Sequence, residues 1–327
     1  MTMLEDVLAQ PHQLGDALWR AQAAGIAQQD RPGGLAVCGM GGSAIGGDLA
    51  AAALGDRATR PITTVRGYAL ESWRGPDSLV LCASYSGNTE ETLACFEAAG
   101  VAGAGRVALT TGGQLAEAAR ADGVPVIGVP AGMQPRAAVI YMIVGVLECA
   151  ALCGAAPGLH AEIDTAAELL GTISPADAEP LADVLHGTVP VVHGAGPTSA
   201  VARRWKTQLN ENAKAAVFCS ELPEANHNEI CFWERGRAAA PFAGVFLEDP
   251  DQHPRIRRRI DLTAAEAERA GAPALRVPAR GESRLERVLS LVMLGDLLSV
   301  RLAELDGVDP DDIDAIVRLK DALDDKP

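Results

Sequence analysis

Residues 82–92 read Cys-Ala-Ser-Tyr-Ser-Gly-Asn-Thr-Glu-Glu-Thr, and the order of residue types in this stretch indicates a fold. The apolar run Leu79–Ala83 stops at a cluster of hydroxyl residues, and a helical pattern begins at Glu90. A strand, a tight loop and a helix start therefore follow one another. Such a turn directs several backbone N–H groups and the positive end of a helix dipole at one point.

Ser84, Ser86 and Thr89 add side-chain donors to this hydroxyl loop, which we define as residues 84–89. The loop contains neither Lys nor Arg, so it differs from a P-loop and from the glycine motif that binds dinucleotides. Neutral donors around a helix start suit a small phosphate monoester. The alternative is that Ser86 or Asn88 only caps the helix. A cap requires one such residue, and this loop has four polar ones, so we favour a phosphate site.

The whole chain has 327 residues, a length that suits two domains. Its net charge of -15 argues against nonspecific binding of nucleic acid. Residues 1–18 carry acids, unlike a signal peptide. The longest apolar run, residues 137–152, is interrupted by Glu148, which argues against a membrane span. Seven cysteines, mostly in apolar runs, indicate reduced thiols rather than a disulfide framework. We therefore expect a cytoplasmic protein that binds neither nucleic acid nor a membrane.

Short apolar strands alternate with helical segments in the first half of the chain. We expect these strands at 35–38, 62–65, 79–83, 106–111 and 125–129. The alternation is typical of a parallel, doubly wound sheet. Residues 189–196 repeat the strand and glycine turn of residues 35–42, which indicates a second domain of the same kind. The sequence predicts an α/β protein with two doubly wound domains, 1–154 and 155–327, each a mainly parallel sheet flanked by helices, with further helices at the C-terminal end.

Ligands of doubly wound sheets bind beyond the carboxyl ends of the strands. The hydroxyl loop is expected at that edge, and so is a glycine-rich turn, residues 39–48, which contains Gly42 and Ser43. Glycine in such a turn allows the backbone to approach a ligand closely. Arg136 lies at the start of a long apolar helix. Because a basic residue gains nothing from the helix dipole at that end, we expect Arg136 to face a polar ligand.

Several of these motifs resemble a known family. Residues 39–43, Gly-Met-Gly-Gly-Ser, and the hydroxyl loop resemble the sugar isomerase (SIS) domain. Residues 210–212, Asn-Glu-Asn, and 223–229, Pro-Glu-Ala-Asn-His-Asn-Glu, are similar to the bifunctional phosphoglucose/phosphomannose isomerases of archaea and bacteria. Residues 307–310, Gly-Val-Asp-Pro, and the later pair Leu-Lys at 319–320 fit the same family. The resemblance therefore covers nearly the whole chain.

The resemblance implies two SIS domains, a homodimer, a hexose 6-phosphate substrate and no metal or other cofactor. The activity that the resemblance implies is that of an aldose–ketose isomerase, which interconverts fructose 6-phosphate with glucose 6-phosphate and mannose 6-phosphate. The sugar-phosphate site that it implies is made of small and hydroxyl-bearing residues: Gly42, Ser43, Ser84, Ser86 and Thr89. Arg136 matches the family arginine near the sugar hydroxyls and the reaction intermediate.

The reaction moves one proton between C1 and C2, and a single carboxylate can carry it through an enediol. Glu211 follows an amphipathic helix beside the second glycine turn, and it matches the catalytic base of the family. From the residues alone, Glu221, Glu224 and Glu229 compete for this role. Glu224 and Glu229 also flank a histidine and are candidates for orienting it.

Opening the cyclic sugar requires a proton donor and acceptor near neutral pH, and histidine meets this requirement. His227 lies in a polar loop and matches the ring-opening residue, which the partner subunit lends in the family. His193 instead ends an apolar strand, so we expect it to pack in the core. Lys320 matches the C-terminal lysine of the family site, although a lysine is favourable near a helix end in any protein.

Two other classes stay open at this point. A regulatory protein that binds a sugar phosphate would keep the hydroxyl loop without needing Glu211 or His227. An SIS enzyme acting on an amino sugar or another sugar phosphate is the third possibility. One departure bears on specificity: residues 309–314, Asp-Pro-Asp-Asp-Ile-Asp, lack the threonine that family members often carry there and that is linked to accepting both epimers. The preferred epimer is therefore left open.

Overall fold

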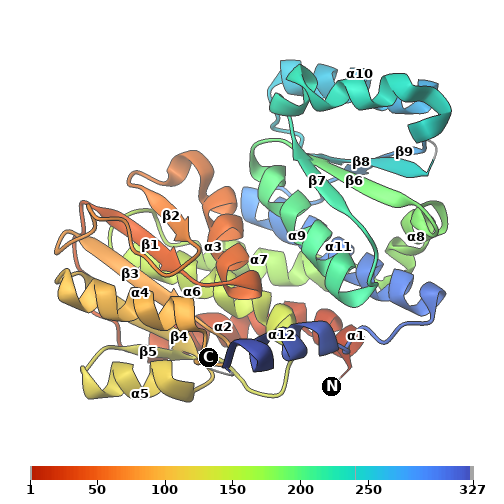
Figure 1. Ribbon diagram of the computed structural model, residues 1–327. Coiled ribbons are helices and arrows are strands. Elements are labelled where there is room, and N and C mark those ends of the chain that lie inside the picture. The colour runs from red at the N-terminus through yellow and green to blue at the C-terminus, as the bar shows by residue number, and fades with distance from the viewer. Residues whose placement is uncertain (1, 240, 325–327) are drawn as a thin grey trace.

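The computed structural model describes residues 2–239 and 241–324 of the chain. Strands and helices alternate along both halves and form two separate sheets, with helices between and outside them (Figure 1). Every strand pair in both sheets is parallel. The prediction of an α/β protein with two doubly wound sheets is confirmed.

The first sheet has the strand order β2-β1-β3-β4-β5. Its strands are β1 (Gly34–Cys38), β2 (Ile62–Val65), β3 (Ser78–Ala83), β4 (Gly105–Thr110) and β5 (Val126–Gly128). Both faces are buried, as is usual for parallel sheets. One face packs against α3 (Gly41–Leu54) and α6 (Val139–Leu152), and the other packs against α4 (Glu90–Val101) and α5 (Gly113–Ala121).

The second sheet repeats this order with four strands, β7-β6-β8-β9. They are β6 (Val189–Gly194), β7 (Phe218–Glu221), β8 (Phe242–Glu248) and β9 (Ala274–Pro278). Helix α9 (Pro197–Asn212) packs on one face. Helix α10 (Pro254–Arg269) and the 3-10 segment η5 (Glu229–Ala239) lie on the other face. The repeat that the sequence predicts at β6 is therefore present.

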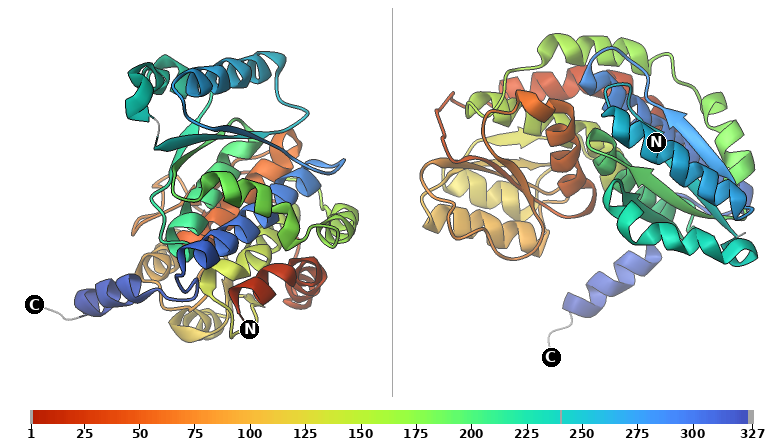
Figure 2. Two further views of the ribbon diagram at one scale, coloured as in Figure 1. Left: turned by 90° about the vertical axis from the view of Figure 1, so that its right-hand side faces the viewer. Right: turned by 90° about the horizontal axis from the view of Figure 1, so that it is seen from above.

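A layer of helices lies between the two sheets (Figures 1 and 2). Helix α3 of the first half contacts both α9 and α11 (Arg284–Asp306) of the second. The remaining helices are α1 (Met3–Leu8), α2 (Gln10–Ala23), α7 (His160–Leu170), α8 (Glu179–Leu185) and α12 (Asp314–Asp324), and the short 3-10 turns are η1 (Gly55–Arg57), η2 (Pro135–Ala138), η3 (Pro175–Asp177) and η4 (Glu224–His227). The predicted division at residues 154 and 155 falls between α6 and α7 and stays a prediction, because α7 packs against both α2 and α11.

The sequence of residues 285–305 predicts a long amphipathic helix, whose apolar face would suit a dimer contact, and the structure forms α11 there. The pattern of residues 285–305 is amphipathic, yet the helix is buried around its whole circumference over most of its length. It lies between α9, α7 and α3, so each face meets another helix. Its buried charges have partners, since Arg287 pairs with Asp249 and Asp296 pairs with Arg204. The apolar surface of α11 is thus used inside one chain and is no support for a dimer.

The exposed amphipathic helix is α12. Figure 2 shows this helix extending away from the rest of the chain. All its side chains from Asp314 to Leu323 are exposed, including those of Ile316, Leu319 and Leu323.

One segment, Pro135–Leu152, is long and apolar enough to cross a membrane when judged by length and composition alone. It comprises η2 and α6, and 83% of it is buried inside the fold, as in the core helix of a globular protein. Five cysteines are buried, among them Cys149 and Cys153 at the end of this helix, while Cys219 and Cys231 are exposed.

Gly295 of α11 provides a test of the helical layer. A Cβ atom at this position would lie 2.2 Å from Nε1 of the fully buried Trp205 on α9. Gly295→Ala should therefore lower the free energy of unfolding by about 1–3 kcal/mol, the usual cost of overpacking. Gly15→Ala is the matched control, because nothing lies within 4 Å of its added Cβ inside α2. Urea unfolding should show the control to be neutral or up to about 1 kcal/mol more stable; equal effects in the two variants would contradict the packing.

Candidate active site

The glycine-rich turn and the hydroxyl loop emerge side by side from the first sheet. Strands β1 and β3 are neighbours, and their last residues are in register, with Cys38 opposite Cys82. A Cβ atom on Gly39 would lie 2.8 Å from the main-chain oxygen of Ala83 and 3.2 Å from Cβ of Ser43. The two loops therefore share the carboxyl edge of the sheet, where ligands of this architecture bind.

Inside the hydroxyl loop, most side chains bond to the loop itself. The Oγ of Ser84 and the Oγ1 of Thr89 are 2.8 Å apart, and the backbone N–H of Gly87 donates to Ser84 Oγ at 3.1 Å. The N–H of Asn88 donates to Ser86 Oγ at 3.2 Å. These bonds hold the hydroxyl groups in a compact turn above the start of α4.

The helix-cap alternative is not what the geometry shows. Thr89 occupies the N-cap of α4 and makes no side-chain cap hydrogen bond. The Oδ1 of Asn88 accepts from the backbone N–H of Gln114 in the neighbouring helix instead. Side chains of the hydroxyl loop therefore leave the first N–H groups of α4 available to an anion, which is the arrangement expected of a phosphate site.

Gly42 and Ser43 open helix α3, and Arg136 lies directly against them. A Cβ atom on Gly42 would come within 3.2 Å of both Arg136 Cα and the carbonyl oxygen of Pro135. Only glycine therefore permits this approach without displacing η2. Ser43 is buried, with 7% of its surface exposed. The first turn of α3, like that of α4, has no side-chain cap.

Arg136 is the buried cation of the site, with 3% of its surface exposed. Its Nε donates to Asn212 Oδ1 at 2.6 Å, its Nη1 donates to Gln134 Oε1 at 3.3 Å, and its Nη2 donates to the carbonyl oxygen of Pro310. Burial lowers the pKa of the guanidinium below its ordinary value, and the nearby Glu211 carboxylate counteracts this. Arginine stays charged under these conditions because its ordinary pKa is so high.

Glu211 lies next to this cation, in the last turn of α9. Its Oε2 is 3.7 Å from Arg136 Nη1, and its side chain is 31% exposed. The carboxylate is therefore accessible to a ligand and adjacent to a positive charge. A proton acceptor and a charge stabiliser that lie this close together suit chemistry in which a carbon acid is deprotonated.

A C-terminal strap, residues 309–312, presents main-chain carbonyl groups to the same region. Pro310 accepts from Arg136, and the carbonyl oxygen of Asp311 accepts from Gln134 Nε2 at 3.3 Å. Two carboxylates of this strap serve the local backbone, since Asp309 Oδ1 accepts from the N–H of Asp311 and Asp312 Oδ1 from that of Asp314. The third, Asp311, acts on Arg136 through its charge and, like Glu211, counteracts the lowering of the pKa of Arg136 by burial.

Lys214 holds the strap to the end of α9. Its Nζ donates to the carbonyl oxygens of Glu211, Asp309 and Asp312, at 2.8, 2.9 and 2.7 Å. Its φ of 56° places it in the left-handed region that terminates the helix. One ammonium group thus joins the candidate base to the segment that leads into α12.

His227 and Lys320 are both on the surface and are not bonded to the pair of Arg136 and Glu211 in the described residues. His227 ends the short turn η4 and Lys320 lies on α12, and both are exposed. Within the described part of the chain, neither makes a hydrogen bond or an ion pair with Arg136 or Glu211. Of the four predicted catalytic residues, the structure therefore brings Arg136 and Glu211 together. His227 and Lys320 are bonded to neither of them within the described residues.

The competing acids and histidines have other surroundings. Glu229 accepts from Ser220 Oγ, and Glu224 Oε1 accepts from Asn228 Nδ2 at 2.9 Å. His193 is 3% exposed and stacks on Phe246 with ring centroids 4.7 Å apart, as expected of a core residue. Desolvation lowers the pKa of His193 to about 4, so the ring is neutral near pH 7.

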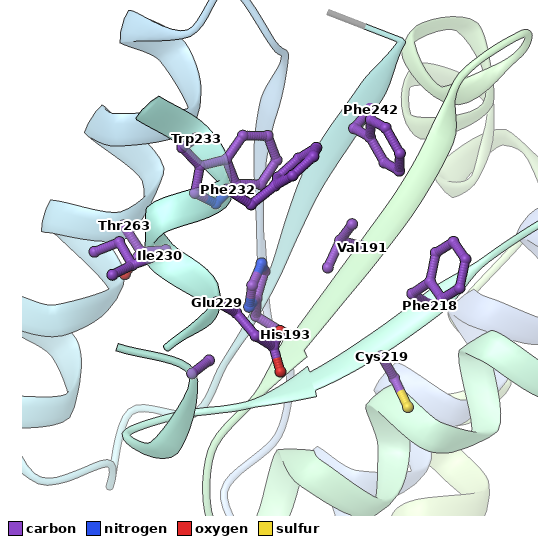
Figure 3. A pocket seen from close by; sticks show the side chains of 11 residues that line it. Val191, His193, Phe218, Cys219, Glu229, Ile230, Phe232, Trp233, Phe242 and Thr263 are labelled. Carbon is purple, nitrogen blue, oxygen red and sulfur yellow. The ribbon is translucent and has the colours of Figure 1, made fainter. Parts of the chain in front are cut away.

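A cavity of about 340 Å³ lies away from this site, between η5 and the second sheet (Figure 3). Its lining is mainly apolar and includes Phe218, Phe232 and Trp233. Of the predicted site residues and their competitors, Glu229 and His193 line it. We therefore place the candidate site by its charged and hydroxyl groups and not by the cavity. Among the residues that the structure describes, no group of three His, Cys, Asp or Glu side chains is arranged to hold a metal ion.

Sequence reasoning missed three residues that hold the site together, Asn212 and Gln134 at Arg136 and Lys214 at the strap. Asn212 was visible only as part of the Asn-Glu-Asn motif, and Gln134 and Lys214 carried no motif signal at all. Their partners are distant in the sequence, 76 positions from Asn212 to Arg136 and 98 from Lys214 to Asp312. Only the folded chain brings them together.

Comparison with known proteins first defines the class. Residues 175–323 match the family described as the bacterial phospho-glucose isomerase C-terminal SIS domain. The solved structure of tagatose-6-phosphate ketose/aldose isomerase from Escherichia coli has the same fold. It aligns with a TM-score of 0.72 and 18% identity over 94% of this chain and 93% of that chain. The fold and the hydroxyl loop together define a protein of the SIS class.

Relatives of higher identity then define the family. The bifunctional phosphoglucose/phosphomannose isomerase of Aquifex aeolicus (strain VF5) is 37% identical over 292 residues, 89% of this chain and 90% of that protein. The enzyme of the same name from Caldicellulosiruptor bescii is 35% identical, over 88% and 89% of the two chains. The chain belongs to the bifunctional phosphoglucose/phosphomannose isomerase family.

Lys214 allows the attachment of the strap to be tested. Lys214→Met removes three charge-assisted hydrogen bonds, so amide hydrogen exchange in residues 308–316 should become at least about ten-fold faster. Lys206→Met is the control, since Lys206 lies on the same helix and forms no hydrogen bond or ion pair within the described residues. Unchanged exchange in the Lys214 variant would show that the strap is held by other contacts.

Proposed function

We propose that this protein interconverts fructose 6-phosphate with glucose 6-phosphate, and with mannose 6-phosphate, through an enediol intermediate. Family membership supports the type of reaction. The observation that carries the proposal is the pair of Glu211 and Arg136, 3.7 Å apart at the carboxyl edge of the first sheet. A binding protein without turnover would have no use for a partly exposed carboxylate beside a buried cation.

In the proposed reaction, Glu211 removes the proton from C2 of the open-chain aldose or from C1 of the ketose. The C–H electron pair forms the C1–C2 double bond, and the carbonyl oxygen gains the negative charge. Arg136 stabilises this charge while the proton of the neighbouring hydroxyl passes to the charged oxygen. The protonated Glu211 then returns its proton to the other carbon, and the oxygen that lost its proton becomes the new carbonyl. General-base catalysis of this kind typically contributes about 10²–10⁴-fold in rate.

The hydroxyl loop and the starts of α3 and α4 would hold the phosphate group. Ser43, Ser84, Ser86 and Thr89 lie at this edge, together with helix N–H groups that carry no side-chain cap. Anchoring the phosphate orients the reacting carbons toward Glu211, and such positioning is a large part of catalysis. The loop contains no Lys or Arg, so neutral groups would bind the phosphate. Arg136 would then contact the other end of the sugar, where the reaction takes place.

We further propose a homodimer in which His227 of one chain completes the site of the other. Two observations support this. His227 is exposed and separate from Glu211 within one chain. Helix α12, which carries Lys320, extends from the body with Ile316, Val317 and Leu319 exposed. An exposed apolar helix face of this kind is typical of an interaction surface.

The choice between epimers and the location in the cell are also proposals. The strap lacks the threonine expected near Asp311, and its main-chain carbonyls bond to Gln134 and Arg136 instead. We expect glucose 6-phosphate to be preferred over mannose 6-phosphate. Buried, unpaired cysteines support a reducing cytoplasm, where the enzyme would serve carbohydrate metabolism.

Glu211→Gln tests the base. The substitution keeps the shape of the side chain but removes the proton acceptor, so kcat should fall by at least about 10²-fold with little change in KM. Exchange of the C1 proton of fructose 6-phosphate in D₂O should almost disappear. Glu221→Gln is the control and should exchange at the wild-type rate. If the Glu211 variant exchanges normally, another carboxylate is the base; if the wild type forms no aldose at all, the proposed function is wrong.

Mixing two inactive proteins tests the shared site. After subunit exchange, Glu211→Gln and His227→Ala chains should recover about a quarter of wild-type activity, because half of the dimers are mixed and each mixed dimer has one intact site. Glu211→Gln mixed with Arg136→Ala should recover none, since both residues come from one chain. Recovery in both mixtures, or a monomer in sedimentation, would rule out the shared arrangement.

A further inference from the structure

Every close partner of the Arg136 side chain is uncharged. Nε donates to the amide of Asn212, Nη1 to the amide of Gln134 and Nη2 to the carbonyl of Pro310. The nearest carboxylate, Glu211, is 3.7 Å away, beyond hydrogen-bonding distance. A buried cation is usually paired with an acid in direct contact. Here the two amides and the carbonyl group orient the guanidinium, and the nearest carboxylate stays 3.7 Å from it.

Asn212 makes the shorter of the two amide contacts, 2.6 Å against 3.3 Å for Gln134, and its own amide is held by a further hydrogen bond. It is fully buried, and its Nδ2 donates to Ser299 Oγ at 2.8 Å. Ser299 Oγ in turn donates to the carbonyl oxygen of Asp296 at 2.6 Å. Because a guanidinium group can only donate, the amide oxygen of Asn212 must face Arg136. Helix α11 thus fixes the orientation of the amide, and the amide fixes that of Nε.

The main chain of Arg136 is held separately. The Nη2 of Arg204 donates to the carbonyl oxygen of Arg136 at 2.9 Å. Arg204 is fixed in turn by two hydrogen bonds to Asp296, at 3.1 and 2.9 Å. The backbone of Arg136 therefore has a support that does not involve Asn212, and within Arg136 a change at Asn212 acts on the guanidinium.

We propose that Asn212 is a positioning residue for Arg136, whose neutral amide orients the guanidinium and preserves its positive charge for the anionic intermediate. This inference rests on the proposed function. An aspartate would have the same shape and would also accept from Nε. It would, however, place a full negative charge 2.6 Å from the guanidinium, closer than Glu211, and so compete with the oxygen that becomes negative in the reaction.

The test compares two ligands that differ at the reacting end. Arabinonate 5-phosphate carries a carboxylate where the enediolate develops charge, and sorbitol 6-phosphate carries neutral hydroxyls there. In Asn212→Asp protein, calorimetry should show at least about ten-fold weaker binding of arabinonate 5-phosphate, and less than about three-fold change for sorbitol 6-phosphate. The kcat should fall with the affinity for the anionic ligand, while KM changes little.

Asn212→Ala separates the effect of an added negative charge from the effect of a lost hydrogen bond to Arg136. It removes the hydrogen bond but adds no charge, so its loss of affinity for arabinonate 5-phosphate should be smaller than that of Asn212→Asp. A merely structural role predicts the reverse order, because aspartate keeps the shape and the acceptor. The reverse order would overturn the proposal.

A double-mutant cycle shows whether Asn212 acts through Arg136. In the Arg136→Ala background, neither substitution at Asn212 should weaken binding of arabinonate 5-phosphate further. If the Asn212→Asp variant does not fold, the same cycle with Asn212→Ala alone still decides whether Asn212 acts through Arg136. Additive losses would contradict the proposal. A wild type that binds both ligands in the expected way but forms no aldose would refute the proposed function and leave the role of Asn212 intact.

Discussion

The buried ion pair of Arg204 and Asp296 is the interaction on which the arrangement of the two halves depends. Both side chains are 1% exposed, and they are joined by two hydrogen bonds between α9 and α11. Gln10 of α2 donates to the same carboxylate at 2.8 Å, and Arg204 also donates to the backbone of Arg136. Removing one partner of such a pair typically costs about 3–5 kcal/mol. The pair therefore links the N-terminal helices, the second half and the candidate site in one network.

This network explains why the candidate site is built from both halves of the chain. The two sheets cover opposite sides of one helical layer, so α9 lies against α3 and brings its last turn to η2. The first half contributes the hydroxyl loop and Arg136, whereas the second contributes Glu211, Asn212 and the strap. Neither half alone contains both the proposed phosphate site and the proposed base.

The chemistry of the site follows from an unequal distribution of charge. The chain has a net charge of -15, yet the groups closest to Arg136 are amides and main-chain carbonyls. The carboxylates of Asp309 and Asp312 accept from the local backbone, and Asp296 is paired with Arg204. An anionic substrate thus meets a local positive charge in an acidic protein, because the fold directs its acids elsewhere.

The sequence by itself determined the parallel sheets, the hydroxyl loop and the residue types at the site. These are local properties: strand hydrophobicity, glycine turns and a helix start are all readable over a few residues. Only the tertiary structure decided which charges meet. Arg136 and Glu211 lie 75 positions apart, and the bond from Arg204 to Asp296 spans 92. It also decided that α11 is buried on all sides while α12 is exposed, since the surroundings of a helix depend on its neighbours and not on its own pattern. The proposed approach of His227 to Glu211 requires a second chain, and neither the pattern nor the fold of one chain contains it.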